Sequence, residues 1–407
     1  MSLEISENSS LWSAESYFKS IAKDLVGEPA KKIISCRICA PNGKGVNYSS
    51  IIHRIEVKYL DNNCDESIAR FIVKILPSGE RGKFIEKHDI FNHEIHVYKK
   101  ILPQTTLLLS QTGSLAKLAP DCVTVLTEPC AIVLEDLSFT HYEMLNRREG
   151  LNLEHTIDIL TNIAKFHAAS VKIYENDPES IERLIGTSIA DCINSFSVFF
   201  KVGMKSLHDE ITQWDGFHDI AEKLDNLTDN FIDKTFENYA KRPTFCVLNH
   251  NDLWTNNFMF KYNSDGKLLD TVILDYQFVY WGSPAIDLNF FLFTSVESHV
   301  RKTYWNFLIH HYHKTLSKTL KDLNVTCAIP KVADIHIELF KKGSHAVYAS
   351  LLTAGVVLAP PDTVDLGLLL AESSEGSSYR KLMFSNPKYV EFIKPVLKEF
   401  YWLGFLD

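Results

Sequence analysis

Between residues 31 and 76 the chain alternates apolar and polar positions with a period of two. In the clearest run the apolar positions fall on one side of an extended chain: Ile51, Ile55, Val57 and Tyr59. A second apolar run covers residues 69–76. Successive side chains of a strand point to opposite faces, so both runs predict strands of a sheet. Helical spacing over residues 11–30 predicts a short helix before them.

The apolar residues that follow recur at the spacing of a helix. In the segment 84–102 they form one stripe: Phe91, Ile95, Tyr98 and Leu102. We therefore predict a helix over this segment. Two further apolar runs, at residues 122–126 and 131–134, are separated by only a few residues and predict a β-hairpin.

Beyond about residue 150 the pattern becomes helical. Helical periodicity is present in four stretches: residues 153–171, 205–240, 284–318 and 330–358. The segment 244–278 is a strand-like island among them. The sequence therefore predicts an α+β fold with a small sheet-rich lobe over residues 1–137 and a larger, mostly helical lobe over residues 138–407.

Composition and charge narrow the class of protein. The 407 residues give room for two lobes, and 45% hydrophobic with 23% charged residues is ordinary globular composition. A net charge of −9 argues against a protein built to bind nucleic acid or an anionic membrane. No signal peptide or membrane-spanning stretch is evident, and eight cysteines fit a reducing compartment. We expect a cytoplasmic protein with no obligate protein partner evident.

The strand-like island carries the residues that suggest chemistry. It contains His250 and Asp252 as an H-x-D motif, with Asn257 five residues after the Asp and Asp275 after an apolar run. This layout is typical of a phosphotransferase site. Asp252 is the candidate base that accepts a hydroxyl proton, and His250 is the candidate brace of its loop. Taken alone, H-x-D has an alternative interpretation as a polar turn after the strand Cys246–Leu248.

Asn257 and Asp275 are candidate metal ligands. Their side chains offer the hard oxygen atoms that Mg²⁺ prefers. A single Asp after a strand is often only a turn or cap residue. The combination of H-x-D, the Asn and the second Asp is more specific, and it predicts ATP and Mg²⁺ as cofactors.

A lysine within an apolar strand is the candidate phosphate-binding residue. Lys74 lies between Val73 and Ile75, where a solvated edge lysine is the simpler interpretation. In a phosphotransferase, such a lysine pairs with the α- and β-phosphates and with a carboxylate on a helix. Glu94 borders the apolar stripe of the predicted helix and is the preferred partner, with Glu86 as its competitor.

Two further segments complete the predicted nucleotide site. The loop 43–50 precedes the first clear strand and offers backbone N–H groups and the hydroxyl of Ser49 to phosphates, although a plain hairpin turn is the alternative. Glu135 and Leu137 belong to the Glu-Asp-Leu segment between the two predicted lobes. We expect their backbone groups to contact adenine at this hinge.

With these residues in place, the chain resembles the ecdysteroid kinase-like family, also called CHK kinase-like. The resemblance covers most of the chain in ordered pieces: Gly45–Ser49, Val73–Lys74, Glu94–Tyr98, Leu134–Leu137, Ala164–Ser170, Asn249–Phe260, Asp275–Gln277 and Ser283–Leu288. The Asp-Tyr-Gln and Glu-Asp-Leu pieces are more specific to this family than H-x-D-x4-N, which aminoglycoside and choline kinases share.

The resemblance implies a bilobal protein-kinase-like fold, ATP with Mg²⁺, and a small-molecule alcohol as acceptor. The family's named activity is phosphorylation of a steroid hormone hydroxyl at carbon 22. The resemblance also implies that Asp287 helps to organise the catalytic loop. One departure is visible, since Asn251 stands where family members usually have Gly. Because Asn tolerates unusual backbone angles, we expect a modest effect on loop shape.

Several functions remain open at this point. An ecdysteroid or another apolar alcohol is the leading acceptor, and a choline-like or other small-molecule alcohol is the alternative. No Ala-Pro-Glu motif and no activation loop follow Asp275, so a protein substrate is not expected. A nucleotide- or hormone-binding pseudokinase is an alternative from a different class. A metal-dependent hydrolase using His250 and Asp252 is a third, for which no convergent third ligand is evident.

Overall fold

The computed structural model describes residues 15–28, 30–39, 50–128, 130–184, 197–240, 243–360 and 363–407. The chain divides into two compact units. The first comprises Met1–Tyr98 and Pro120–Tyr142, and the second comprises Lys99–Ala119 and Glu143–Asp407. The boundary predicted at residue 137 would place residues 99–119 in the first lobe, whereas the structure groups them with the second unit.

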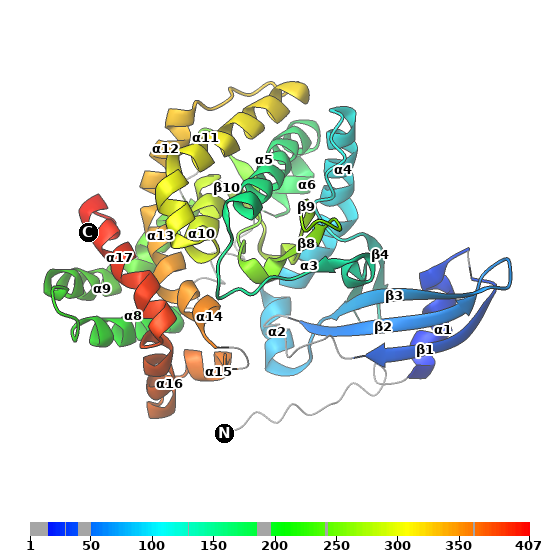
Figure 1. The fold of residues 1–407 in the computed structure, drawn as a ribbon, viewed down its shortest axis with the longest axis horizontal. Coiled ribbons are helices and arrows are strands. Elements are labelled where there is room, and N and C mark those ends of the chain that lie inside the picture. The colour runs from blue at the N-terminus through cyan, green and yellow to red at the C-terminus, as the bar shows by residue number, and fades with distance from the viewer. Residues whose placement is uncertain are drawn as a thin grey trace. The chain divides into compact units, whose positions relative to one another are not determined.

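The first unit is built on a five-stranded sheet with the strand order β1-β2-β3-β5-β4, drawn in blue to blue-green in Figure 1. The strands are β1 (Lys32–Cys39), β2 (Ile51–Leu60), β3 (Glu66–Ile75), β4 (Cys122–Thr127) and β5 (Cys130–Glu135). Every neighbouring pair in this sheet is antiparallel. The predicted strands and the predicted β4–β5 hairpin are confirmed.

One face of this sheet is covered by α1 (Glu15–Val26). The helix ends before Gly27, which adopts the left-handed conformation. The helix and the strands share one apolar core, which includes Phe18, Ala22, Leu25, Ile55, Val57, Phe71 and Val73. Because side chains alternate along a strand, Lys74 of β3 points away from the face that carries Val73. The core therefore fixes the strand from which Lys74 projects.

The helix predicted over residues 84–102 begins earlier, extends further and is interrupted. It consists of α2 (Gly79–Lys87), α3 (Ile90–His96), the π-helical turn η1 (Val97–Ile101) and α4 (Leu102–Gln111). The break between α2 and α3 falls at Asp89, whose φ of 53° is left-handed. The π-helical turn precedes Pro103, whose nitrogen cannot donate a hydrogen bond to the preceding turn. The apolar stripe alone does not reveal either irregularity.

The second unit is mostly helical, as predicted. Besides α4 it contains α5 (Leu153–Asn176), α6 (Pro178–Glu182), α8 (Ser197–Ile211), α9 (His218–Ala240), α10 (Ala285–Thr294), α11 (Ser298–Asp322), α12 (Val332–Lys341), α13 (Gly343–Tyr348), α14 (Ala354–Leu358), α15 (Leu366–Leu370), α16 (Ser374–Phe384) and α17 (Pro387–Leu403). Within the described part of the chain, no helix combines the length and apolar character that crossing a bilayer requires.

Three of the predicted helical stretches are divided. The stretch 330–358 consists of α12, α13, the π-helical turn η5 (Ala349–Thr353) and α14, whereas the other two are divided by short turns. The stretch 205–240 is split between α8 and α9, and the turn contains Gly216 with a φ of 77°. The stretch 284–318 is split between α10 and α11. In both cases the apolar periodicity continues through the turn, because both helices bury a face in the same unit.

Four short strands in the second unit position the strand-like island. β7 (Val247–Asn249) pairs with β10 (Tyr280–Gly282), and β8 (Phe258–Tyr262) pairs with β9 (Leu268–Ile273), both antiparallel. A further two-residue strand, β6 (Tyr142–Glu143), lies where the two units join in sequence. The chain runs from β7 to β8 and from β9 to β10, so the two connecting loops meet beside the paired strands.

The C-terminal helix α17 is joined to α11 by an ion pair between a buried arginine and a half-buried glutamate. Arg301 of α11 is 1% exposed, and its Nη1 lies 3.0 and 3.1 Å from the two carboxylate oxygens of Glu399. The Arg301 guanidinium also lies 4.2 Å from the centre of the Phe293 ring. Burial lowers the pKa of Arg301, and Glu399 opposes this effect. The guanidinium therefore depends on Glu399 as its counter-ion.

Candidate active site

In the first unit, the lysine of β3 forms a buried ion pair with a helix carboxylate. Lys74 Nζ lies 2.8 Å from Glu94 Oε1 and 2.7 Å from Glu94 Oε2. Lys74 is 5% exposed and Glu94 is 1% exposed. A buried ammonium group is costly unless a carboxylate accompanies it, so this pairing accounts for a lysine inside an apolar strand. The interpretation of Lys74 as a solvated edge lysine is wrong.

The competing carboxylate, Glu86, has a different neighbour. It lies on α2, before the break at Asp89, and together with burial it raises the pKa of the Cys130 thiol. Glu94 follows the break on α3. The left-handed Asp89 thus separates the two carboxylates into different helices, and Glu94 is the one that pairs with Lys74 at 2.7 Å.

The Glu-Asp-Leu segment ends β5 and begins a 3-10 turn. The backbone N–H of Glu135 donates to Asp121 O at 3.0 Å, and that of Asp136 donates to Arg70 O at 3.3 Å. Asp136 caps the turn η2 (Leu137–Thr140) by accepting from Ser138 N, and it pairs with Arg54 Nε at 2.6 Å. Leu137 is buried, and its carbonyl accepts the hydroxyl of Thr140. An adenine contact at Glu135 would therefore use the carbonyl group, because its N–H is already bonded.

Ser49 and the rest of the loop 43–49 lie outside the described residues. Ser50, at the start of β2, is described and is 4% exposed. The prediction that this loop contacts phosphates stays a prediction from the sequence.

In the second unit, His250 follows β7 and braces the loop that carries Asp252. His250 Nε2 lies 2.8 Å from the carbonyl oxygen of Leu274, and Asp252 N donates to His250 Nδ1 at 3.3 Å. The imidazole also packs edge-on against Tyr276, with ring centres 4.7 Å apart. Both ring nitrogens therefore contact the chain itself. This arrangement supports a bracing role and leaves no ring nitrogen for the metal site of a hydrolase.

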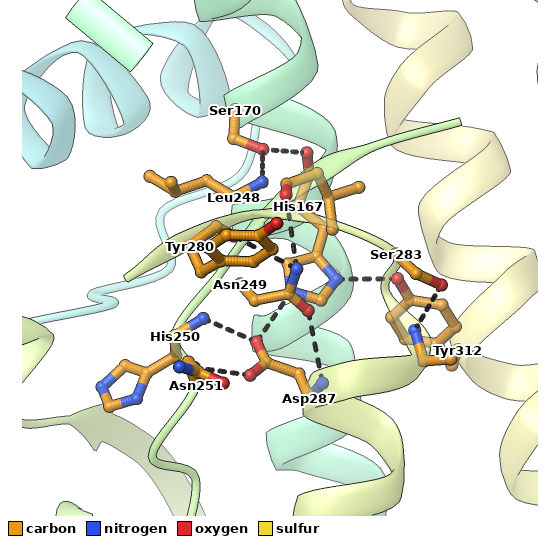
Figure 2. A network of polar contacts seen from close by, with 12 residues as sticks. His167, Ser170, Leu248, Asn249, His250, Asn251, Tyr280, Ser283, Asp287 and Tyr312 are labelled. Carbon is orange, nitrogen blue, oxygen red and sulfur yellow. Dashed lines mark hydrogen bonds and ion pairs between the residues drawn. The ribbon is translucent and has the colours of Figure 1, made fainter. Parts of the chain in front are cut away.

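The backbone of the same loop is held by Asp287, the third residue of α10 (Figure 2). Asp287 Oδ2 accepts from His250 N at 2.7 Å, and Oδ1 accepts from Asn251 N at 2.7 Å. The Asp287 backbone N–H in turn donates to Asn249 Oδ1 at 3.2 Å. Asp287 is completely buried. Its carboxylate fixes two successive peptide groups of the loop immediately before Asp252.

A third N–H group reaches Asp287 from α5. His167 Nε2 lies 3.0 Å from Asp287 Oδ2, and His167 Nδ1 lies 2.7 Å from the Tyr312 hydroxyl (Figure 2). The Asp287 carboxylate can only accept a hydrogen bond, so the His167 N–H that faces it is on Nε2. Burial raises the pKa of Tyr312 well above its ordinary value, so its hydroxyl stays protonated and can donate to Nδ1 of the neutral imidazole. These two hydrogen bonds of His167 connect α5 and α11 to the loop that carries Asp252.

Asn251, where the family usually has Gly, adopts the left-handed conformation. Its φ is 65°, a value that glycine reaches without strain and asparagine reaches more easily than most residues. The backbone angles here are thus of the unusual kind that Asn tolerates, and the expected modest effect on loop shape stays a prediction. The Asn251 side chain adds an interaction that glycine lacks, because its Oδ1 accepts the Tyr239 hydroxyl at 2.9 Å.

The candidate base and one candidate metal ligand contact each other directly. Asn257 Nδ2 donates to Asp252 Oδ2 at 3.0 Å and to the Asp252 carbonyl oxygen at 2.8 Å. Asn257 closes the 3-10 turn η3 (Thr255–Asn257) immediately before β8. The amide nitrogen thus faces Asp252, and the amide oxygen is the atom suited to a cation.

The second candidate metal ligand is brought close by the strand ladder. Phe258 pairs with Ile273, and the N–H of Leu274 donates to Asn257 O at 2.8 Å. Asp275 is the next residue and has a left-handed φ of 66°. Its Oδ2 accepts from Gln277 Nε2 at 3.2 Å, which restrains the carboxylate. The structure therefore gathers Asp252, Asn257 and Asp275 around the two connecting loops.

This donor set fits a magnesium ion. One amide oxygen and one carboxylate are hard ligands, and Mg²⁺ in phosphotransferases takes few protein ligands together with phosphate oxygens and water. Asn257 and Asp275 would hold the ion. Their anchoring through Asp252 and Gln277 orients both side chains before any ligand binds.

Several supporting residues were not assigned a role from the sequence. His167, Gln277 and Asn249 lie in the quoted family pieces, but their contacts with Asp287, Asp275 and the loop become visible only in three dimensions. Tyr239 and Tyr312 carry no local signal, because a tyrosine on an apolar helix face is ordinarily a core residue.

Comparison with known proteins identifies a family for the chain. No curated protein matches the chain. A family model does match, over residues 44–325, and it is described as the ecdysteroid kinase-like family. This range includes Lys74, Glu94 and the whole loop network from His250 to Asp287. It spans more than half of the chain, and the chain belongs to the ecdysteroid kinase-like family.

Proposed function

We propose that this protein transfers the γ-phosphoryl group of ATP, with Mg²⁺, to a hydroxyl group of a small-molecule alcohol, on a bilobal protein-kinase-like fold. Family membership supports a kinase in general. The observation that carries the proposal is the bridging position of Asn257, which bonds the Asp252 carboxylate through its amide nitrogen and Leu274 through its backbone oxygen. The candidate base and both candidate metal ligands thereby form one connected group.

In the proposed reaction, Asp252 acts on the acceptor. The acceptor oxygen forms a bond to the γ-phosphorus while its proton passes to the Asp252 carboxylate, and the bond from the γ-phosphorus to the bridging oxygen breaks to release ADP. The hydrogen bond from Asn257 directs one carboxylate oxygen, so that the carboxylate presents a fixed face. His250 and Asp287 keep the loop in place during this step.

Mg²⁺, when bound, offsets the negative charge that develops on the phosphoryl oxygens. Asn257 Oδ1 and the Asp275 carboxylate are its proposed ligands. Gln277 supports this assignment, because its bond to Asp275 Oδ2 orients the carboxylate of a residue in a left-handed conformation. A left-handed non-glycine residue costs free energy, and such residues cluster at functional sites.

For the nucleotide, we assign Lys74 to the α- and β-phosphates and Glu94 to the carboxylate that positions Lys74. A lysine already paired with a buried carboxylate has a defined position, so little side-chain freedom is lost when phosphate binds. Glu135 and Leu137 are proposed to contact adenine through backbone groups. The role of Ser49 at the phosphates rests on the sequence alone.

The acceptor proposed first is an ecdysteroid or another apolar alcohol. The description of the matching family supports this class. The chemistry of Asp252 requires only a hydroxyl group that reaches its carboxylate, so a choline-like alcohol is the second class to test.

The test is detection of phosphorylated product by mass spectrometry with Mg-ATP and a panel of ecdysteroid, choline-like and glycosidic alcohols. Wild type and Asp252→Asn are run in parallel. Product from wild type alone supports the proposal and identifies the acceptor class. Binding of Mg-ATP without product from any acceptor would contradict turnover and favour a pseudokinase. Absence of Mg-ATP binding would overturn the nucleotide-site assignment.

A further inference from the structure

The residue before the proposed base is held in a conformation that its side chain disfavours. Asn251 has a φ of 65°, and only glycine adopts this region without a penalty from Cβ. Asp287 holds the Asn251 backbone N–H at 2.7 Å. A backbone bond alone does not specify which residue type is tolerated here, so the side-chain contacts of Asn251 are informative.

The Asn251 side chain is held by a tyrosine from the preceding helix. The Tyr239 hydroxyl donates to Asn251 Oδ1 at 2.9 Å, and Tyr239 lies in the last turn of α9. Burial raises the pKa of Tyr239 well above its ordinary value. The phenol therefore stays protonated throughout the physiological range and acts as a permanent donor.

Tyr239 is itself fixed on several sides. The Tyr280 hydroxyl donates to the carbonyl oxygen of Tyr239, and the two rings pack edge-on with centres 4.9 Å apart. The His345 ring packs edge-on from α13 at 5.9 Å. Tyr280 also accepts from Asn249 Nδ2 through its carbonyl oxygen, at 3.2 Å. Tyr239 thus packs at the end of the β7–β10 ladder where Tyr280 pairs with Asn249.

We infer that the Tyr239 hydroxyl is a positioning group of the catalytic loop, which stabilises Asn251 in its left-handed conformation and thereby sets the direction of Asp252. The inference rests on the proposed function of Asp252 as the base. Asp287 binds the backbone N–H of residue 251 and Tyr239 binds its side chain. The backbone and the side-chain conformation of this residue are therefore both restrained. Asp252 is the next residue, and its carboxylate accepts a hydrogen bond from Asn257 Nδ2 at 3.0 Å.

This role separates Tyr239 from an ordinary core tyrosine. A core tyrosine contributes packing irrespective of the residue at position 251, and loss of its hydroxyl lowers stability without a specific effect on kcat. A positioning tyrosine acts only through the Asn251 side chain. Replacing Asn251 by Gly removes the acceptor and also supplies a residue that adopts the left-handed region unaided. The two roles therefore predict different results in a double-mutant cycle.

The experiment compares wild type, Tyr239→Phe, Asn251→Gly and the double variant, with Mg-ATP and the acceptor that gives most product. We expect Tyr239→Phe to lower kcat by about three- to tenfold, the effect of losing one buried hydrogen bond, with little change in KM for ATP. In the Asn251→Gly background, Tyr239→Phe is expected to have no further effect on kcat. An equal reduction in both backgrounds, or no reduction in either, overturns the inference.

Tyr389→Phe is the matched control. Tyr389 lies on α17, and its hydroxyl is also buried and donates to the carbonyl oxygen of Leu351 at 2.7 Å. Removal of this hydroxyl is expected to lower the urea midpoint and leave kcat unchanged. A loss of kcat in Tyr389→Phe equal to that in Tyr239→Phe would show general loosening and would contradict a specific role for Tyr239.

A second readout does not depend on turnover. The described tryptophans all lie in the second unit, so their fluorescence follows its unfolding in urea: Trp214, Trp254, Trp281, Trp305 and Trp402. Non-additive midpoints across the four proteins of the cycle support the Tyr239–Asn251 coupling, and additive midpoints overturn it. If wild type forms no product with any acceptor, the proposed function fails while the unfolding cycle still decides whether the two residues are coupled.

Discussion

Asn257 Nδ2 lies 3.0 Å from Asp252 Oδ2, which joins a predicted metal ligand to the predicted base. The two residues are separated by a 3-10 turn, and the same amide nitrogen also contacts the Asp252 carbonyl oxygen at 2.8 Å. The turn and the base are thus held by one side chain. A substitution at either residue is therefore expected to disturb the other, although only Asp252 is proposed to accept a proton.

The first prediction concerns the base. Asp252→Asn retains the hydrogen-bonding shape of the side chain but removes its ability to accept a proton. We expect turnover to fall by about 10²–10⁴-fold while Mg-ATP binding survives. Product formation is measured by mass spectrometry and nucleotide binding by calorimetry. Asp265→Asn, in the exposed turn between β8 and β9, is the control and should behave as wild type. Full turnover in Asp252→Asn would remove this residue from its role.

The second prediction separates the two carboxylates near Lys74. Glu94→Gln removes the charge that is paired with the Lys74 ammonium at 2.7 Å, whereas Glu86→Gln alters a residue beside Cys130. We expect Glu94→Gln to weaken Mg-ATP binding by about tenfold or more, because a buried lysine without its carboxylate loses its defined position. Glu86→Gln should leave the affinity within about twofold of wild type. Calorimetric titration with Mg-ATP measures both, and equal losses would contradict the assignment of Glu94.

The sequence predicts the strands and the overall order of elements better than the shape of the helices. The alternation from Ile51 to Tyr59 indicates a strand with one apolar face, and β2 covers these residues, although only Ile55 and Val57 of that face are fully buried. The helix of residues 84–102 was predicted as continuous because its apolar stripe passes through Asp89 and through the π-helical turn. Left-handed residues and wide turns depend on local backbone energetics that periodicity does not report.

Around the candidate site, the sequence identifies charged residues but not their supports. Lys74 and Glu94 can be proposed as a pair because both their strand and helix are recognisable from periodicity. The contact between Tyr239 and Asn251 joins the end of one helix to a loop, and no spacing rule relates them. The relay from Tyr312 through His167 to Asp287 likewise joins three helices that are far apart in the sequence. Such contacts arise from tertiary packing alone.

The third prediction concerns the stability of the second unit. Glu399→Gln leaves the Arg301 guanidinium buried without its counter-ion. Because the Glu399 side chain is 31% exposed, we expect the free energy of unfolding to fall by about 1–3 kcal/mol, less than for a fully buried pair. Asp322→Asn removes an exposed ion pair with Lys318 on α11 and should cost less than about 0.5 kcal/mol. Urea unfolding followed by tryptophan fluorescence measures both. Similar losses in the two variants would show that burial of Arg301 carries no special cost.

The fourth prediction starts from a buried imidazole on α13. His345 is 1% exposed, and neither ring nitrogen has a hydrogen-bond partner among the described residues. Its ring packs among Tyr239, Phe290 and Tyr348. Burial lowers the pKa of His345 to about 4; nearby Lys342 adds to this effect and Asp287 opposes it. The folded protein therefore binds this proton far more weakly than the unfolded chain does.

The pH dependence of stability follows from this difference. The unfolded imidazole has a pKa of about 6.5, so between pH 6.5 and 4 the unfolded state binds more protons and stability falls as the pH falls. His345 should account for a loss of about 2 kcal/mol between pH 7.5 and 5. His345→Phe keeps an aromatic ring at this position and lacks that component. The free energy of unfolding of wild type and of His345→Phe is measured in urea between pH 7.5 and 5. The wild type should lose more stability than the variant as the pH falls, so that any advantage of the wild type narrows or reverses. Parallel curves of free energy against pH would show that His345 has the same pKa in the folded and the unfolded state.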